Sequence, residues 1–544
     1  MTGAQLSWFR ALYATVRKVL AIFALLSIGS LAGTQQLQAQ QGTVPRQKLP
    51  SAEKIVEGYL KAIGGKKRIA TIRDATYEWR IQLKDQTMGI AKTQTKTPSS
   101  VRSELIFGNG QIVSAANPRS AWMHGLDGKP HTLTDAEAAA ARLQAVLDAG
   151  HLLELKKSNV LARAVAVRAS ETTPVYAVEF SLRTGARLRY LFSSTTKLLV
   201  SVEDEARKTT TRFEDYRSES SILEPHRMSI NSGGTGELTF LLQRASYNTG
   251  VADSAFDPPA AAEALDVKAL LQEVSVNQDQ LEKRFTEYSF IQKETSREIS
   301  GKGELKKETV KVFEVFPIAN REPVMKLISE NGVPLSGERA AKEQKRAEEE
   351  FAKAERDKDK DEQKVINRRA ERQRKREARA KKGDDDDIGI SVFLRVCEFV
   401  APRRERFRGR DAVVFDFRPR PDFKAGNRQE ELISKLVGVV WIDPADKQVM
   451  RLEARLAEGF KMGGGLLVNL KPGAAMVMEQ TRMVEGVWLP RLAQINLSVK
   501  VLLFGGGDYN QTYEWSDYKH FSGEVGDYKL DAPKTEKGEA AKKP

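Results

Sequence analysis

The chain has 544 residues, 40% hydrophobic and 29% charged, a composition typical of a globular protein and a length that predicts two or three domains. Its one cysteine, Cys397, excludes an internal disulfide framework and any metal site built from several cysteines. The formal net charge of +14 is typical of proteins that bind an acidic partner, such as nucleic acid, anionic lipid or an acidic protein.

The N-terminus has the pattern of a secretory signal. Arg10, Arg17 and Lys18 precede an apolar run at 19–33, and Ala39 offers a small residue for cleavage. Residues 1–40 are therefore predicted to be a signal peptide, and 41–50 a polar linker. A retained anchor is the alternative, although the run is short for a bilayer span of about 20 residues. Thr34 stands where a lipidated cysteine would be needed, so we expect a soluble periplasmic protein.

A first folded unit is predicted over residues 51–260. Ser51 is placed to cap a helix that ends at the pair Gly64-Gly65, and Thr134 to cap a second helix ending at Gly150. Period-two alternation predicts strands before and after the second helix, at 76–83, 101–107, 120–124, 175–182 and through a meander that ends at Tyr247. This order predicts an α+β fold with one antiparallel sheet and its helices on one side.

A second unit of the same kind is predicted over residues 261–533, followed by a disordered tail at 534–544. It begins with a helix from Asp266 to about Phe290 and resumes after a charged insertion at 336–387. Between Lys364 and Lys382 the insertion has ten Lys or Arg against two Glu, so it is either a solvated helix or disordered. The predicted elements of this unit are strands at 309–316, 324–329 and 413–417, a helix at 428–436 and a meander at 437–521.

The two meanders share a spacing. Glu214, Arg217 and Pro225 are separated by 3 and 8 positions, and the same separations join Glu479, Arg482 and Pro490 (482−479 = 3, 490−482 = 8). We interpret them as two tandem copies of one β-rich unit.

The basic charge is concentrated in the insertion, which lacks the interleaved Gly and aromatic residues of a nucleic-acid tract. No nucleic-acid partner is expected. An anionic membrane surface attracts such a segment by about 1 kcal/mol per cation, so that surface or an acidic protein is the expected contact.

The sequence gives no catalytic or metal-binding pattern. The five histidines fall in no ligand spacing, and the acidic run at 384–387 lacks the alternating ligands and glycine of a calcium loop. The expectation is a protein without enzymatic activity, cofactor or metal. A hydrolase of envelope glycans or lipids is a third hypothesis.

Several segments resemble the LolA/LolB-like periplasmic lipoprotein-carrier superfamily. These are the signal, YLKAIGG at 59–65, VWIDPADKQVMRLE at 440–453, and FEDYR with ILEPHRMSI, echoed by EQTRMVEGVWLPRLAQINL. The resemblance implies a curved antiparallel sheet that wraps over helices as an incomplete barrel, and whose concave apolar face shelters acyl chains. The chain departs from the family in having two units instead of one, and in the charged insertion.

An apolar lining suits an acyl ligand, and methionine adapts to varied chains. The same side chains could equally be ordinary core residues. The alternative function is an envelope sensor or regulatory module that docks a partner protein through the insertion. The candidate lining residues are Trp441, Met450, Leu452, Leu456, Met476, Met478, Trp488, Ile495, Leu497, Tyr176 and Phe180.

Overall fold

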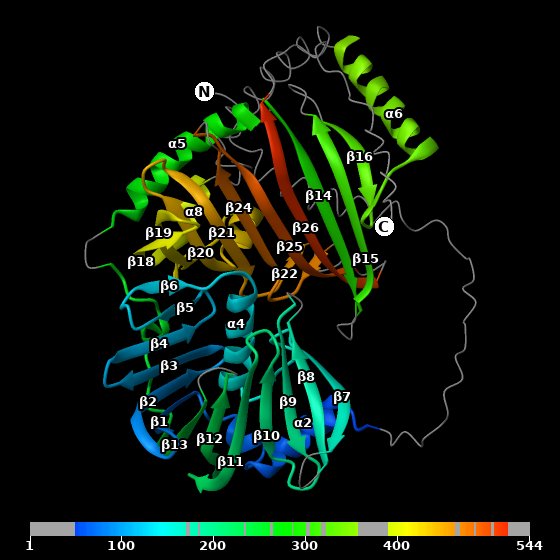
Figure 1. The fold of residues 1–544 in the computed structure, drawn as a ribbon. Coiled ribbons are helices and arrows are strands. Elements are labelled where there is room, and N and C mark those ends of the chain that lie inside the picture. Colours follow the sequence, from blue (N-terminus) through cyan, green and yellow to red (C-terminus); the bar gives the residue numbers. More distant parts are fainter. Residues whose placement is uncertain are drawn as a thin grey trace, which may run out of the picture.

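The computed structural model describes residues 49–520, except for gaps at 170–173, 183–184, 233–235, 262–264, 286, 301–304, 317–322, 357–389, 463–467, 484–485 and 502–504. The predicted signal, most of the linker, much of the insertion and the tail lie outside the described residues. Two large antiparallel sheets lie one above the other (Figure 1). Within the described chain, no helix is both long and apolar enough to cross a membrane.

The first sheet has 13 strands and is organised around the pairing of its first and last strands, β1 and β13. From β1 the strands run outward to β6, and from β13 they run outward in reverse order to β7. The strands are β1 (Asp74–Leu83), β2 (Gln86–Lys96), β3 (Ser100–Phe107), β4 (Gly110–Ala116), β5 (Ala121–His124), β6 (Pro130–Thr132), β7 (Leu161–Ala169), β8 (Pro174–Ser181), β9 (Arg187–Ser193), β10 (Leu199–Asp204), β11 (Thr209–Glu219), β12 (Ile222–Asn231) and β13 (Glu237–Tyr247).

Two helices of the first unit pack on one face of this sheet. Helix α2 (Ala52–Ala62) begins as predicted, because the Ser51 hydroxyl accepts a hydrogen bond from the Lys54 amide at 3.3 Å. Helix α4 (Asp135–Ala149) lies between β2–β5 and β9. Leu60 of α2 and Leu147 of α4 share one buried core with Phe180 and Phe192. We call this helix-covered face the inner face. Two short helices, α3 (Lys66–Ile69) and η1 (Asp253–Phe256), complete the unit.

The second sheet repeats this pairing order. Its first strand β14 pairs with its last strand β26, β15–β17 extend to one side, and β25, β24, β21, β20, β19 and β18 extend to the other. The bounds are β14 (Tyr288–Ile299), β15 (Leu305–Phe316), β16 (Val324–Glu330), β17 (Val333–Pro334), β18 (Cys397–Phe407), β19 (Arg410–Pro419), β20 (Leu436–Asp443), β21 (Gln448–Leu456), β22 (Phe460–Met462), β23 (Val468–Leu470), β24 (Ala475–Arg482), β25 (Trp488–Val501) and β26 (Gly505–His520).

Three helices cover the inner face of the second sheet: α5 (Val267–Phe285), α8 (Ile390–Val396) and α9 (Arg428–Ile433). Val274, Val396 and Ile433 from these helices meet Phe415 and Phe417 of β19 in one core. Helix α5 ends at Phe285, before the predicted end near Phe290, because Tyr288 already starts β14. The predicted α+β class with curved antiparallel sheet is confirmed.

The described start of the charged insertion is a helix, α6 (Gly337–Arg356). It does not stand free in solvent, because Ala347 is fully buried and packs with Phe351 on Phe316 and Val324 of the sheet. The sequence prediction of a solvated helix overlooked these two apolar residues. The densest basic tract, at 364–382, lies outside the described residues.

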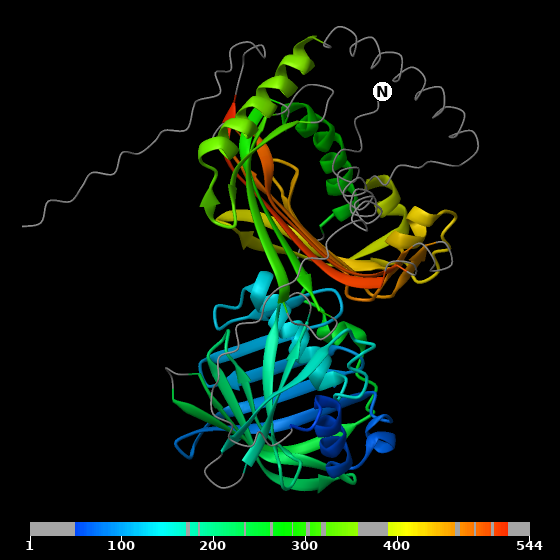
Figure 2. The same cartoon turned by 90° about the vertical axis from the view of Figure 1, so that its right-hand side faces the viewer.

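The first unit lies against the outer face of the second sheet, opposite α5 (Figure 2). On β19, Phe415 points to the inner core, whereas Val414 and Asp416 point to the outer face. The sequence pattern assigned Arg451 and Glu453 of β21 to the polar face of a half-buried strand. Instead their exposed fractions are 0% and 7%, because the first unit covers them.

Candidate functional site

The predicted lining residues of the first unit lie in its core region. Phe180 is fully buried between the sheet and the two helices. Tyr176 is half-buried at the edge of the same core, with the Lys197 ammonium 5.9 Å from the centre of its ring. Whether either residue contacts a ligand stays a prediction.

Three predicted lining residues of the second unit form a packed cluster on the outer face: Trp441, Met450 and Trp488. Strict alternation predicted that Met450 shares a face with Leu452. A β-bulge breaks that alternation, because Trp441 pairs with Arg451 and Ile442 pairs with Val449. Met450 is the extra residue, and the predicted stripe is wrong at this position.

The remaining candidates of the second unit share its inner face. Leu452 lies opposite Met478, and Met476 lies opposite both Ala454 and Ile495. All but Ala454 are half-buried. Leu456 is buried with Phe460 and Ala474, and half-buried Leu497 packs against that cluster. We call Leu452, Met476, Met478, Ile495 and Leu497 the second apolar strip.

A corresponding strip on the first sheet was missed by the sequence analysis. Val101 and Leu105 lie on one face of β3: Val101 packs against α4, and Leu105 belongs to a separate apolar cluster. Trp79, Ile81, Phe240 and Leu242 are its buried members, and its partly buried members include Leu105, Phe107, Met228, Ile230 and Leu238. We call this set the first apolar strip. In the sequence, the alternation of Tyr77, Trp79 and Ile81 indicates the β1 part of this strip.

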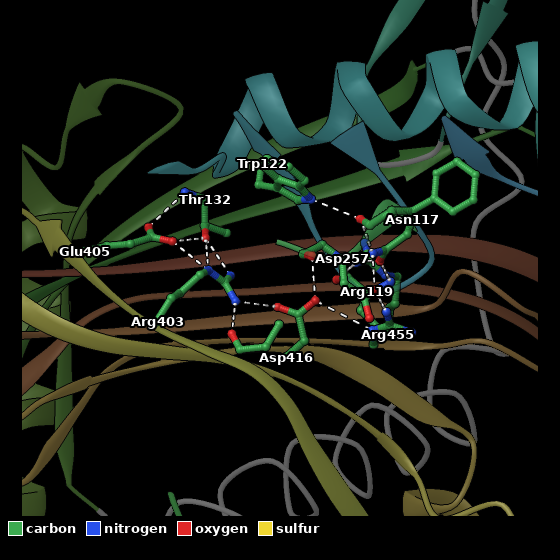
Figure 3. A network of polar contacts seen from close by, with 12 residues as sticks. Asn117, Arg119, Trp122, Thr132, Asp257, Arg403, Glu405, Asp416 and Arg455 are labelled. Atoms are coloured by element: carbon green, nitrogen blue, oxygen red, sulfur yellow. Dashed lines mark hydrogen bonds and ion pairs between the residues drawn. The ribbon is translucent and has the colours of Figure 1, made fainter. Parts of the chain in front are cut away.

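A buried polar network joins the two sheets (Figure 3). Arg403 of β18, 1% exposed, donates to Asp416 at 3.1 Å and to Glu405 at 2.7 Å. Thr132 of the first sheet donates its hydroxyl to Glu405 at 2.5 Å and accepts from Arg403 at 2.6 Å. Ser120 donates to the other oxygen of Asp416 at 2.6 Å. Each buried charge therefore has partners from both units.

The network continues along β21. Arg142 of α4 donates to Glu453 at 3.0 Å, and Arg451 donates to Asp135 at 2.7 Å. Arg455 donates to the backbone carbonyls of Pro118 and Arg119. Burial lowers the pKa of Arg455 well below its usual range, and the nearby carboxylate of Glu453 only partly opposes that fall. The contact between the sheets is thus largely ionic and hydrogen-bonded.

A cavity of about 170 Å³ lies on the outer face of the first sheet. This volume is well below the roughly 300 Å³ of the smallest typical ligand pockets, so the cavity does not suit an acyl chain. Its lining contains none of the predicted residues and comprises Arg102, Gln111, Val113, Trp122, His124, Asp257 and Pro259.

Among the described side chains, no group of three His, Cys, Asp or Glu could hold a metal ion.

Comparisons with known proteins give partial likenesses of fold. No family model and no curated protein matches the chain. A DUF1329 family protein from Desulfovibrio piger is 11% identical, with a TM-score of 0.27, over 38% of this chain and 97% of that one. A LolA superfamily protein from Nitrosomonas europaea is 11% identical, with a TM-score of 0.28, over 38% and 98% of the two chains.

The Pseudomonas aeruginosa MucA/MucB complex is matched over more of the chain. Its identity is 8% and its TM-score 0.17, over 85% of this chain and 94% of that one. All of these TM-scores lie below 0.5, so a function has to be inferred from the residues themselves.

Proposed function

We propose that this protein is a periplasmic carrier that binds the acyl chain of a lipid or lipoprotein on its inner faces, with no catalytic step. The observation that supports this most is the pair of apolar strips. Each strip lies on the helix-covered face of its sheet, and both contain side chains that stay partly exposed after packing. Such surfaces on both sheets suit an apolar ligand.

The energetics of an acyl chain make a sheltered apolar surface necessary. At about 0.8 kcal/mol per methylene, exposing a chain of roughly 16 carbons to water costs about 12 kcal/mol of free energy. Large partly buried side chains such as Phe107 and Met478 can recover part of this by contact. The flexible methionines of the second strip adapt to chains of different shape.

We also propose that the two units are copies of one LolA-like unit. The turns after β9 and β20 support this. Ser193 accepts hydrogen bonds from the amides two and three residues later, at 3.2 and 3.1 Å, and Asp443 does the same at 2.9 and 2.8 Å. Glu214 also pairs with Arg227 and Glu479 with Leu492, 13 positions apart in both cases.

A matched pair of variants on β3 tests the first strip. Leu105 lies on the inner face, whereas its neighbour Ile106 is 40% exposed on the outer face. In titrations with a fluorescent fatty-acyl probe, Leu105→Asp should weaken binding by at least tenfold, and Ile106→Asp should leave it unchanged. Equal effects, with both variants folded by circular dichroism, would argue against an inner-face site.

The second strip has its own pair. Met478 lies opposite Leu452 on the inner face, and Val477 lies opposite Glu453 on the outer face. If both sheets bind, Met478→Asp should remove one of two bound probes, while Val477→Asp keeps both. One bound probe in the wild type and in each variant would restrict the site to the first sheet.

A second candidate function is the docking of a partner protein through the insertion, and α6 favours it. One side of α6 is anchored by Ala347 and Phe351, while Lys345 and Glu349 form an ion pair on its exposed surface. Deleting residues 357–387 and keeping α6 separates the two candidates. Acyl binding should survive the deletion if the protein is a carrier, and a partner captured by the full chain should be lost if the insertion docks it.

A further inference from the structure

One carboxyl group lies on the inner face of the first sheet beside the first apolar strip. The Tyr247 and Tyr77 hydroxyls both donate to the same oxygen of Glu224, Oε1, at 2.7 and 3.0 Å. Burial raises the pKa of Glu224, and the two hydroxyl donors oppose that rise. Glu224 nevertheless keeps some accessible surface. No described residue bonds to the second oxygen of this carboxyl group, Oε2.

The indole of Trp79 lies on the same face of the same sheet and has an unpaired donor. Its side chain is 8% exposed, and its Nε1 is buried without a hydrogen-bond partner among the described residues. Other tryptophans of the chain have paired indoles: Trp122 donates to the Phe256 carbonyl at 3.0 Å, and Trp515 donates to Gln292 at 2.8 Å. A buried N–H without an acceptor is destabilising, which a bound ligand would relieve.

Tyr77 connects the two groups. It donates to Glu224 and its ring centre lies 6.2 Å from that of Trp79, two residues along β1. Side chains two apart on a strand point to the same face, so Tyr77 lies between the Glu224 carboxyl and the Trp79 indole on one side of the sheet. Beyond Trp79 the apolar cluster continues through Phe240 and Leu105. The arrangement has a polar end and an apolar extension.

The chemistry of this polar end restricts the ligand. The indole N–H requires an acceptor, which an ammonium group lacks. A phosphate or carboxylate would be disfavoured beside Glu224 whenever that carboxyl is ionised. A hydroxyl or an amide has both a donor and an acceptor and no charge, so either satisfies Trp79 and Glu224 together.

We propose that Trp79 and Glu224 form a head-group site for an uncharged hydroxyl- or amide-bearing amphiphile, whose acyl chain lies on the first apolar strip. This inference rests on the proposed acyl-binding function and specifies which end of the ligand the first sheet recognises. The hydroxyl of an acylglycerol and the amide of an N-acylated amine share this chemistry.

Competition against the fluorescent acyl probe tests the site in the intact chain. The competitors have one acyl length and differ in their polar end: a monoacylglycerol, a primary fatty amide, a methyl ester and a fatty acid. The first two should compete about tenfold better than the fatty acid. The methyl ester offers an acceptor but no donor and should be intermediate. A preference for either the glycerol or the amide identifies the source of the head group.

Trp79→Phe keeps the ring and removes the donor, and should abolish the preference of about tenfold. Trp122→Phe is the matched control, since its indole lies on the outer face and is already paired. Loss of the preference in Trp79→Phe alone supports the site. Its persistence in Trp79→Phe, or equal binding of all four competitors to the wild type, would overturn it. A wild type that binds no probe would instead contradict the acyl-binding function itself.

Discussion

Ser120 and Asp416, 296 positions apart in the chain, are joined by a hydrogen bond of 2.6 Å between the serine hydroxyl and a fully buried carboxylate. The same carboxylate accepts from Arg403 at 3.1 Å and lies 3.6 Å from the Arg119 guanidinium. One side chain therefore ties β19 of the second sheet to the loop between β4 and β5 of the first unit. Because a buried charge without partners is strongly destabilising, this contact favours one fixed arrangement of the sheets.

Replacing Asp416 by Ala should destabilise the protein by about 3–5 kcal/mol, because Arg403 is left buried without that partner. Urea unfolding measures the change. The control is Asp411→Ala on the same strand, whose side chain is 85% exposed and 4.0 Å from Arg406, and it should change stability by less than about 0.5 kcal/mol. Similar effects of the two variants would show that the junction contributes little.

Asp148 should make stability depend on pH. Burial raises its pKa to about 6, against the donors Gln144 and Tyr190. The folded protein then binds more protons than the unfolded chain between about pH 4 and pH 6, so this residue lowers stability as the pH rises through that window. Asp148→Asn should be more stable than the wild type by about 2 kcal/mol at pH 7 and equal to it near pH 4. A difference that is constant with pH would refute the assignment.

The attachment of α6 depends on one small side chain. Ala347→Glu places a carboxylate in its fully buried contact with Phe316, and we expect the helix to detach from the sheet. Hydrogen exchange over 337–356 should then accelerate by at least tenfold. Lys345→Glu, at a side chain that is 77% exposed, should leave the exchange rate unchanged. Protection retained in Ala347→Glu would mean that other contacts hold the helix.

Local chemistry made much of the fold predictable. The Ser51 cap and the alternation along β8 depend on neighbours in the sequence, so they could be predicted from it. The face of Met450 could not, because the bulge that redirects it arises from pairing between β20 and β21. The burial of Arg451 could not either, since it depends on Asp135, more than 300 positions away.

The two strips of the candidate site were less predictable than the fold, for a related reason. The second strip could be predicted because its methionines and alternating aliphatic residues lie within one stretch of sequence. The first strip gathers Trp79, Leu105, Met228 and Phe240 from four separate strands, which only the sheet topology brings together. The unpaired indole of Trp79 is likewise a property of its surroundings and has no counterpart in the sequence.

Native mass spectrometry with lipid extraction tests the acyl-binding function most directly. The protein should lack residues 1–40 and be purified from a bacterial periplasm without detergent. We expect a bound phospholipid, acylglycerol or acylated peptide at a defined stoichiometry, one per strip if both sheets bind. A clean mass of the unliganded chain, with no lipid in the extract and none taken up from added vesicles, would contradict the carrier function and favour the docking of a partner protein.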